Sequence, residues 1–234
     1  MKALIFAAGL GERMRPLTDH TPKPLLLAGG KPLIVWHLER MAAAGVREVV
    51  VNTSWLADQF PAVLGDGTQW GLKITYSYEG STPLETGGGM LHALPLLGDA
   101  PFLLVNGDIW TDFDFVGLPC SPAGLAHLVM VDIPNFARQG DFALGQDGRM
   151  HDTGEPRLTY AGIGLYRPAL LHDWHTHMMA AGHAGEGGSP RFPLASLLRA
   201  HMAEGRIHGQ YHSGRWTDVG TPQRLAELDR QLRA

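Results

Sequence analysis

Three cations follow a short glycine-rich turn near the start of the chain, at Arg13, Arg15 and Lys23. The turn contains Gly9 and Gly11 and comes directly after the apolar run 3–8, which reads as a buried strand. A turn of this kind offers backbone N–H groups, and the cations add positive charge. The pattern therefore predicts a binding site for a polyanion such as a nucleoside triphosphate.

Two familiar phosphate-binding motifs do not fit this turn. A P-loop needs Gly-Lys-Ser/Thr four residues after its first glycine, and Lys23 lies too far downstream. The dinucleotide-binding fingerprint needs a third glycine where this chain has Met14. The turn alone is weak evidence, and an ordinary strand-to-helix connection is its simplest alternative.

Further motifs along the chain, in order, give the turn a family context. Together they resemble the signature of the sugar-1-phosphate nucleotidylyltransferases, and the resemblance covers essentially the whole chain. The resemblance implies an α/β fold, a Rossmann-like three-layer nucleotidyltransferase fold with a mixed, mostly parallel central sheet. The segments that carry it are Ala7–Thr18, Pro22–Leu25, Leu84–Gly88, Val105–Asp108, Tyr160–Ile163 and Trp216–Pro222.

The reaction that the resemblance implies is attack by a sugar 1-phosphate oxygen on the α-phosphorus of a nucleoside triphosphate. Because the attacking phosphate is already an anion, catalysis should depend on positioning and on cations. We expect Arg13 and Lys23 to be these catalytic cations. Solvated surface cations are the alternative for both, and Arg15 is explained equally well by a salt bridge that supports the turn.

Two aspartates are the expected metal ligands. Asp108 follows a buried strand, where α/β sheets place their ligands, and Asp218 lies in a second short motif. The resemblance assigns Mg²⁺ to this pair, and two carboxylates with phosphate oxygens suit that ion. A turn aspartate and a helix cap are the structural alternatives.

The resemblance also implies where the nucleotide binds. Many relatives have glycine at the position of Glu85 and a glutamine upstream that reads the base. In this chain Glu79 or Glu85 would have to read it, or the backbone around Thr86 alone. A carboxylate can accept from uracil N3–H but suits the paired donors of guanine even better, and both glutamates could simply face solvent. The full expected nucleotide set is Ala8, Gly9, Gly11, Glu12, Arg13, Lys23, Glu79, Glu85, Thr86 and Gly87.

The expected sugar contacts are Asn106, Asp141, Glu155 and Tyr160, where Asp141 and Glu155 could instead be exposed loop acids. Within the family, the compact form and the loop sequence 11–18 are most similar to members for which the resemblance implies UTP and N-acetylmuramic acid α-1-phosphate as substrates. GTP with mannose 1-phosphate, and glucose 1-phosphate with UTP or dTTP, are alternatives. A regulatory protein that binds a nucleotide sugar without turnover is the alternative from another class.

Length and composition fit this interpretation. The 234 residues suffice for one large α/β domain, expected over 1–234 without the C-terminal β-helix of some relatives. A net charge of −4 argues against nonspecific nucleic-acid binding. The single Cys120, the lack of a signal-peptide pattern and the lack of a membrane-spanning apolar run predict a cytoplasmic protein without a membrane partner. The sequence does not predict an oligomeric state.

Alternating apolar segments predict the elements that position these residues. Strands are expected at 48–52, 73–78, 102–105, 125–132 and 158–166, and helices at 32–44, 56–64, 87–97, 192–204 and from Thr221.

The glycine-rich segment 180–189 is either a loop over the site or a plain surface connection. His172, His175 and His177 do not have zinc-protease spacing and are expected on a helix surface.

Overall fold

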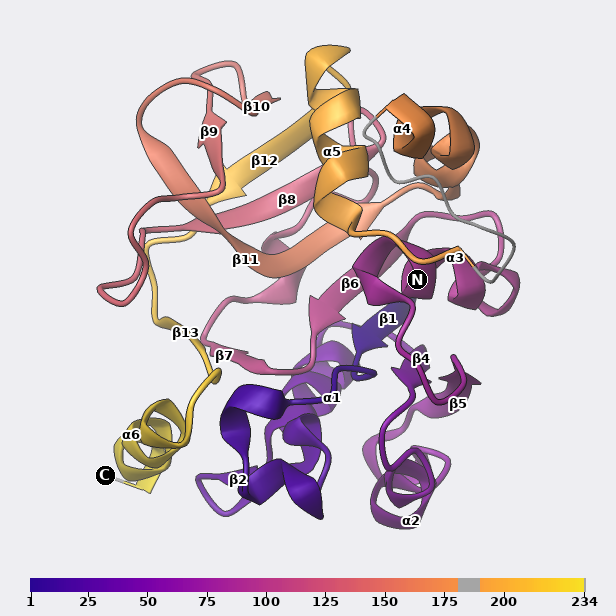
Figure 1. Cartoon of the computed structure of the whole chain (residues 1–234), viewed down its shortest axis with the longest axis vertical. Coiled ribbons are helices and arrows are strands. Elements are labelled where there is room, and N and C mark those ends of the chain that lie inside the picture. Colours follow the sequence, from indigo (N-terminus) through magenta and orange to yellow (C-terminus); the bar gives the residue numbers. More distant parts are fainter. Residues whose placement is uncertain (181–189, 234) are drawn as a thin grey trace.

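A computed structural model describes residues 1–180 and 190–233 (Figure 1). Among these residues, nine strands form the main sheet: β1 (Lys2–Phe6), β4 (Glu48–Thr53), β5 (Lys73–Tyr78), β6 (Phe102–Asn106), β8 (Ala126–Val131), β9 (Phe142–Leu144), β10 (Met150–His151), β11 (Arg157–Tyr166) and β12 (Ile207–Tyr211). Their order is β10-β9-β11-β6-β1-β4-β5, and β8 pairs with both β11 and β12.

The sheet is parallel at its centre, where β1 pairs with β4 and β6 and β4 pairs with β5. β11 then runs antiparallel to β6, β8 and β9. The short apolar runs of β1 and β4 are buried on both faces, as parallel strands in an α/β fold require. The predicted α/β architecture with a mixed central sheet is confirmed.

Helices cover both faces of the sheet and make three layers. Alternate residues of β1 point to opposite faces: Ile5 joins a core cluster with side chains of α1 (Leu33–Ala43) and α2 (Gln59–Leu64). Leu4 joins a second cluster with side chains of the helices on the other face, which are α3 (Glu85–Leu97), α4 (Trp174–Ala180) and α5 (Leu194–Ala203). The hydrophobic core therefore lies in two slabs, one on each side of the sheet.

The end of the chain packs beside its beginning. Figure 1 shows α6 (Pro222–Arg233), in yellow, next to β2 (Leu27–Ala28). β2 pairs with β3 (Lys31–Pro32), and β13 (Trp216–Asp218) pairs with β7 (Ile109–Thr111). Leu225 and Leu228 of α6 contribute to a third, smaller core cluster that also holds Met14 of the glycine turn.

The helices begin at slightly different residues from those expected. α2 begins at Gln59 rather than at residue 56, because Leu56 has a left-handed φ of 50° that a helix does not allow. α5 begins only at Leu194, after the extended Pro193. The expected loop over 181–189 lies outside the described residues, and no helix among those described is long and apolar enough to cross a membrane.

Candidate active site

A cavity of about 800 Å³ lies at the carboxyl ends of the central parallel strands. It begins at the end of β1 and continues to the residues that follow β4, β5 and β6, the edge at which α/β sheets bind ligands. Its described lining combines the glycine turn with residues from six other segments. These include Ala8, Gly9, Gly11, Glu12, Arg13, Lys23, Asn52, Glu79, Glu85, Thr86, Asn106, Asp108, Arg191 and Gly220.

Two buried side chains, Thr18 and Met14, hold the glycine turn in place. Gly11 has a left-handed φ of 66°, and a Cβ there would lie 2.8 Å from Cγ2 of Thr18. Thr18 is buried and donates a hydrogen bond from Oγ1 to Gly11 O at 2.8 Å. Met14 anchors the turn because its side chain is buried in the small cluster under α6. Arg13 is exposed at the cavity.

Arg15 belongs to the support of the turn. Its Nε lies 3.3 Å from Asp19 Oδ1, one helical turn further along the chain. The described residues that line the cavity do not include Arg15. Of the two explanations for this cation, the structure therefore favours the salt bridge.

Lys23 and Asp108 meet at the cavity although they are far apart in the sequence. Lys23 Nζ donates to Asp108 Oδ2 at 2.6 Å, and Lys23 is only 8% exposed. The lysine therefore carries its charge inside the cavity wall, where it is screened less than a surface cation. Asp108 lies just after β6, as its place in the sequence predicts.

Asp218 reaches the same edge through the small sheet. It is the last residue of β13 and pairs with Ile109 of β7, while Val219 N donates to Asp108 O at 2.9 Å. The Oδ2 of Asp218 accepts from Arg224 Nη1 at 2.9 Å. Both carboxylate oxygens lie within 3.1 Å of an ideal Cβ on Gly220, which lines the cavity. The two aspartates are thus brought to one place from distant motifs.

A chain of buried hydrogen bonds ties three strand ends to α3. Ala7 N donates to Asn52 Oδ1 at 2.6 Å, Asn52 Nδ2 donates to Glu79 Oε1 at 2.5 Å, and Leu84 N donates to Glu79 Oε2 at 2.8 Å. Burial raises the pKa of Glu79, while its two donors act in the opposite direction. We call these three bonds the Asn52–Glu79 relay. Both oxygens of Glu79 are engaged by the protein itself.

The turn before α3 is braced against the segment that leads into α5. Thr86 Oγ1 accepts from Leu194 N at 2.9 Å, and Gly87 N donates to Phe192 O at 2.9 Å. Glu85 has a left-handed φ of 62°, and its Oε1 lies 3.4 Å from Arg191 Nε. Gly87 is not among the described residues that line the cavity. It packs against Phe192, and a Cβ on Gly87 would collide with the Phe192 ring.

Sequence reasoning missed Asn52 and Arg191. Asn52 had one available signal, because it is a polar residue at the end of an apolar strand. Arg191 had none, because nothing in its own segment indicates that it lies opposite Glu85.

Of the four expected sugar contacts, only Asn106 lines the cavity among the described residues. The other three are engaged elsewhere. Asp141 Oδ2 accepts from Tyr160 N, and Glu155 Oε2 accepts from the backbone N of Arg157. Tyr160 does not turn its hydroxyl to the cavity: it lies 2.8 Å from the Tyr166 hydroxyl, and burial raises the pKa of both phenols.

A glycine turn after β1 and an aspartate after the neighbouring β6 line one cavity at the edge of the sheet. These features define the class of α/β nucleotide-binding enzymes. The chain belongs to the nucleotidyl transferase family, whose model matches residues 2–118. It is 47% identical to the N-acetylmuramate alpha-1-phosphate uridylyltransferase of Neisseria meningitidis serogroup B, over 97% of this chain and 96% of that protein. The protein of the same name from Caulobacter vibrioides is 36% identical over 98% of this chain and 96% of its own length.

Other relatives carry other names. The mannose-1-phosphate guanyltransferase of Aspergillus fumigatus is 42% identical over 95% of this chain, which spans 62% of that longer protein. Among solved structures, a putative glucose-1-phosphate thymidylyltransferase from Bacillus anthracis superposes with a TM-score of 0.81 at 18% identity, over 100% of this chain and 95% of that one. This structural likeness supports the fold.

Proposed function

We propose that this chain transfers UMP from UTP to N-acetylmuramic acid α-1-phosphate and releases pyrophosphate. The main structural support for phosphoryl-group transfer is the contact between Lys23 and Asp108, in a cavity that is also lined by the glycine turn. The choice of substrates rests on the two uridylyltransferase relatives, which match nearly the whole chain. We also propose that the reaction takes place in the cytoplasm, in the recycling of cell-wall sugars.

The proposed chemistry is a single displacement at the α-phosphorus. An oxygen of the sugar 1-phosphate forms the new P–O bond while the bond to the β-phosphate oxygen breaks, and the electron pair leaves with pyrophosphate. The attacking oxygen is already ionised, so no general base is needed. We assign to Arg13 and Lys23 the stabilisation of charge on the phosphates, and to Ala8, Gly9, Gly11 and Glu12 the turn that holds the triphosphate.

Asp108 and Asp218 are the residues that would hold Mg²⁺. Asp108 lines the cavity, and Asp218 lies beside Gly220, which also lines it. Carboxylate oxygens are hard donors, which suit this ion better than a nitrogen or sulfur donor. Lys23 and Arg224 each contact one oxygen of a carboxylate and orient it. Bound Mg²⁺ neutralises part of the phosphate charge.

The position of Glu79 supports a uracil base over guanine. Each of its oxygens already accepts a hydrogen bond from the protein, and Glu85 pairs with Arg191 through one oxygen. The buried Glu79 is therefore less suited to accept the two adjacent donors of guanine. We therefore propose that Thr86 and the neighbouring backbone contact the base, and that Glu79 and Glu85 shape its pocket.

Asn106 is the sugar contact that the cavity supports best. A large sugar substituent could extend beyond the cavity toward β11. For such a substituent we still propose contacts with Asp141, Glu155 and Tyr160. N-acetylmuramic acid, with its lactyl ether, is larger than glucose or mannose and is therefore the sugar for which they matter.

Pyrophosphate release tests the proposal with the purified protein and Mg²⁺. UTP, dTTP and GTP are each combined with N-acetylmuramic acid α-1-phosphate, glucose 1-phosphate and mannose 1-phosphate. We expect the first pair to give the highest kcat/KM. Preference for GTP with mannose 1-phosphate would overturn the substrates but keep the reaction, whereas no release with any pair would leave a nucleotide-sugar sensor.

The Asp108→Asn variant tests the assigned site. It is isosteric and keeps an acceptor for Lys23, so we expect a folded protein with a somewhat lower melting temperature, because the buried Lys23 loses its ion pair. We expect a fall in kcat of roughly 10²-fold or more, because the proposed Mg²⁺ loses a charged ligand. Asp99→Asn, at an exposed aspartate in the loop after α3, is the matched control and should keep wild-type rates. A wild-type kcat for Asp108→Asn would refute the assignment.

A further inference from the structure

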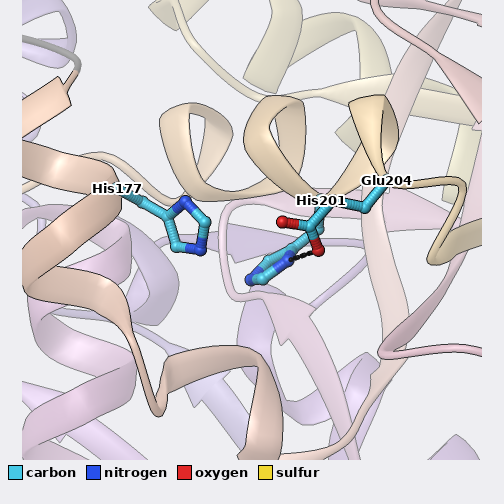
Figure 2. Close-up of side chains that lie close together, drawn as sticks. All are labelled: His177, His201 and Glu204. Carbon is cyan, nitrogen blue, oxygen red and sulfur yellow. Dashed lines mark hydrogen bonds and ion pairs between the residues drawn. The ribbon is translucent and has the colours of Figure 1, made fainter.

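A second group of potential ligands lies between α4 and α5, apart from the residues assigned to the nucleotide. Figure 2 shows His177 from α4 pointing toward His201 and Glu204 at the end of α5. The ligand atoms of these three residues, which we call the histidine cluster, lie within 4.8 Å of one another. His201 is only 4% exposed, whereas Glu204 is open to solvent.

Both ring nitrogens of His201 have an oxygen partner. Its Nε2 lies 3.2 Å from Leu170 O, and because a carbonyl can only accept, Nε2 is the donor. In a neutral ring Nδ1 then has a lone pair. That lone pair faces Glu204 Oε2 at 3.0 Å. A cation could lie between this lone pair and the carboxylate, and Arg206 Nη1 already lies 3.4 Å from the same Glu204 oxygen.

The arrangement around His201 is the one that metal-binding histidines use. Such a histidine almost always donates its second ring N–H to a backbone carbonyl or carboxylate, which orients the lone pair of the other nitrogen toward the metal. In this protein Leu170 O is the carbonyl that lies at the second ring nitrogen of His201.

His177 supplies the third donor. Its ring centroid lies 4.6 Å from that of His201 at an interplanar angle of 68°, so the rings meet edge to face rather than stacking. We propose that the histidine cluster binds a divalent transition-metal ion, best Zn²⁺, through two imidazoles and one carboxylate. This donor set suits Zn²⁺ and not Mg²⁺, and solvent at Glu204 gives access and a fourth ligand.

The metal would fasten α4 to the element that supports the nucleotide cavity. Trp174 of α4 stacks on Phe192 with ring centroids 5.0 Å apart, and Phe192 O accepts from Gly87 N. The site therefore has a structural rather than a catalytic role. Its expected effect is on the stability of the α4–α5 pair.

Calorimetric titration of the metal-stripped full chain with Zn²⁺, in excess Mg²⁺ to saturate the carboxylate site, tests the proposal. We expect one Zn²⁺ per chain, and a visible absorption spectrum typical of four-coordinate Co²⁺ when that ion replaces it. His177→Ala and Glu204→Gln should each weaken Zn²⁺ binding by roughly tenfold or more, since each removes one ligand. Both variants keep the buried His201 itself, although each removes a neighbour of its ring.

His172→Ala is the matched control, because His172 is an exposed histidine close to α4. It should bind Zn²⁺ like the wild type. Failure of the wild type to bind Zn²⁺, or equal binding by His177→Ala, would overturn the proposal and leave only a hydrogen bond between His201 and Glu204. Pyrophosphate release by His177→Ala stays at the wild-type rate in either case, so the result is independent of the proposed function.

Discussion

At the residue scale, the two glycines of the phosphate-binding turn have different reasons to be glycine. Gly11 has a positive φ, and a Cβ there would press on Thr18. Gly9 has no described atom within 4 Å of an ideal Cβ, although it lines the cavity. The fold therefore requires Gly11, whereas only a ligand that approaches the backbone closely can require Gly9.

Replacing each glycine by alanine separates these two requirements. We expect Gly9→Ala to keep the wild-type melting temperature and to raise the KM for the triphosphate at least about tenfold, since its methyl group occupies ligand space. Gly11→Ala should lower the unfolding free energy by about 1–2 kcal/mol. Thermal melts and steady-state kinetics give both values. A Gly9→Ala protein with unchanged kinetics would show that phosphates do not approach this residue.

His37 gives the protein a predictable loss of stability in acid. The ring is fully buried on α1, its Nε2 lies 2.9 Å from Ile109 O, and burial lowers the pKa of His37 from 6.5 to about 4. The unfolded chain binds this proton at higher pH than the folded one. The stabilisation is therefore present above pH 6.5 and is lost as the pH falls to about 4, by about 3 kcal/mol.

Urea unfolding at several pH values measures this loss. The difference in unfolding free energy between wild type and His37→Gln should change by about 3 kcal/mol between pH 7 and pH 4, because glutamine does not titrate. The His151→Gln protein, altered at an exposed histidine, should follow the wild type. A constant difference across this range would mean that His37 is protonated in the folded state as easily as in the unfolded chain.

At the scale of the elements, the cavity depends on how strand ends are joined. β1, β4 and β5 are adjacent in the sheet, and the Asn52–Glu79 relay connects their ends to the start of α3. Gly89 of α3 has room only for hydrogen, because a Cβ would collide with Glu79. The relay therefore sets the position of the phosphate-binding turn relative to the base pocket.

An exchange of donor and acceptor tests the relay. Asn52→Asp places two carboxylates against each other, and Glu79→Gln brings a second amide against that of Asn52. Each should lower the unfolding free energy by about 1–3 kcal/mol and reduce kcat/KM. In the double variant, the new amide can donate to the new carboxylate and accept from Leu84 N, so both losses should be largely restored.

The double variant also distinguishes positioning from base reading. If the Glu79 carboxylate contacts the base directly, the exchange should restore stability but leave an altered preference among UTP, dTTP and GTP. If neither stability nor kcat/KM recovers, the relay does not have the role we assign to it.

At the scale of the whole molecule, the last helix supports residues from the first and middle parts of the chain. α6 packs in the small cluster with Met14 of the glycine turn and Trp110 of β7, and Asp229 accepts from Gly29 N at 2.9 Å. α6 also follows β13, which ends at Asp218. The geometry of both sides of the active site therefore depends on one small core.

Leu228→Ala should weaken this support. The side chain is 2% exposed, so its truncation should cost about 2–4 kcal/mol. Leu96→Ala, at a surface position of α3 that is 38% exposed, should cost much less. Hydrogen exchange should show faster opening of the glycine turn and β13 in Leu228→Ala. Equal protection in both variants would mean that α6 opens independently of the site.

The sequence by itself determined the architecture and the type of chemistry. Apolar runs with a period of two and amphipathic segments depend on neighbours along the chain, so strands such as β4 and helices such as α1 could be predicted to within a few residues. The order of the motifs indicated the family. The cations and aspartates could be proposed as site residues because their types and their places in short motifs are local features.

Only the tertiary structure decided which of these groups meet and where their side chains point. The pairing of Lys23 with Asp108 follows from the strand order β6-β1, which local periodicity does not encode. Tyr160 looked like a sugar contact, but the pairing of β11 turns its hydroxyl to Tyr166. His177 gains His201 only through the packing of α4 on α5. Such contacts are set by which buried polar groups can satisfy one another in the folded chain, and that depends on the whole fold.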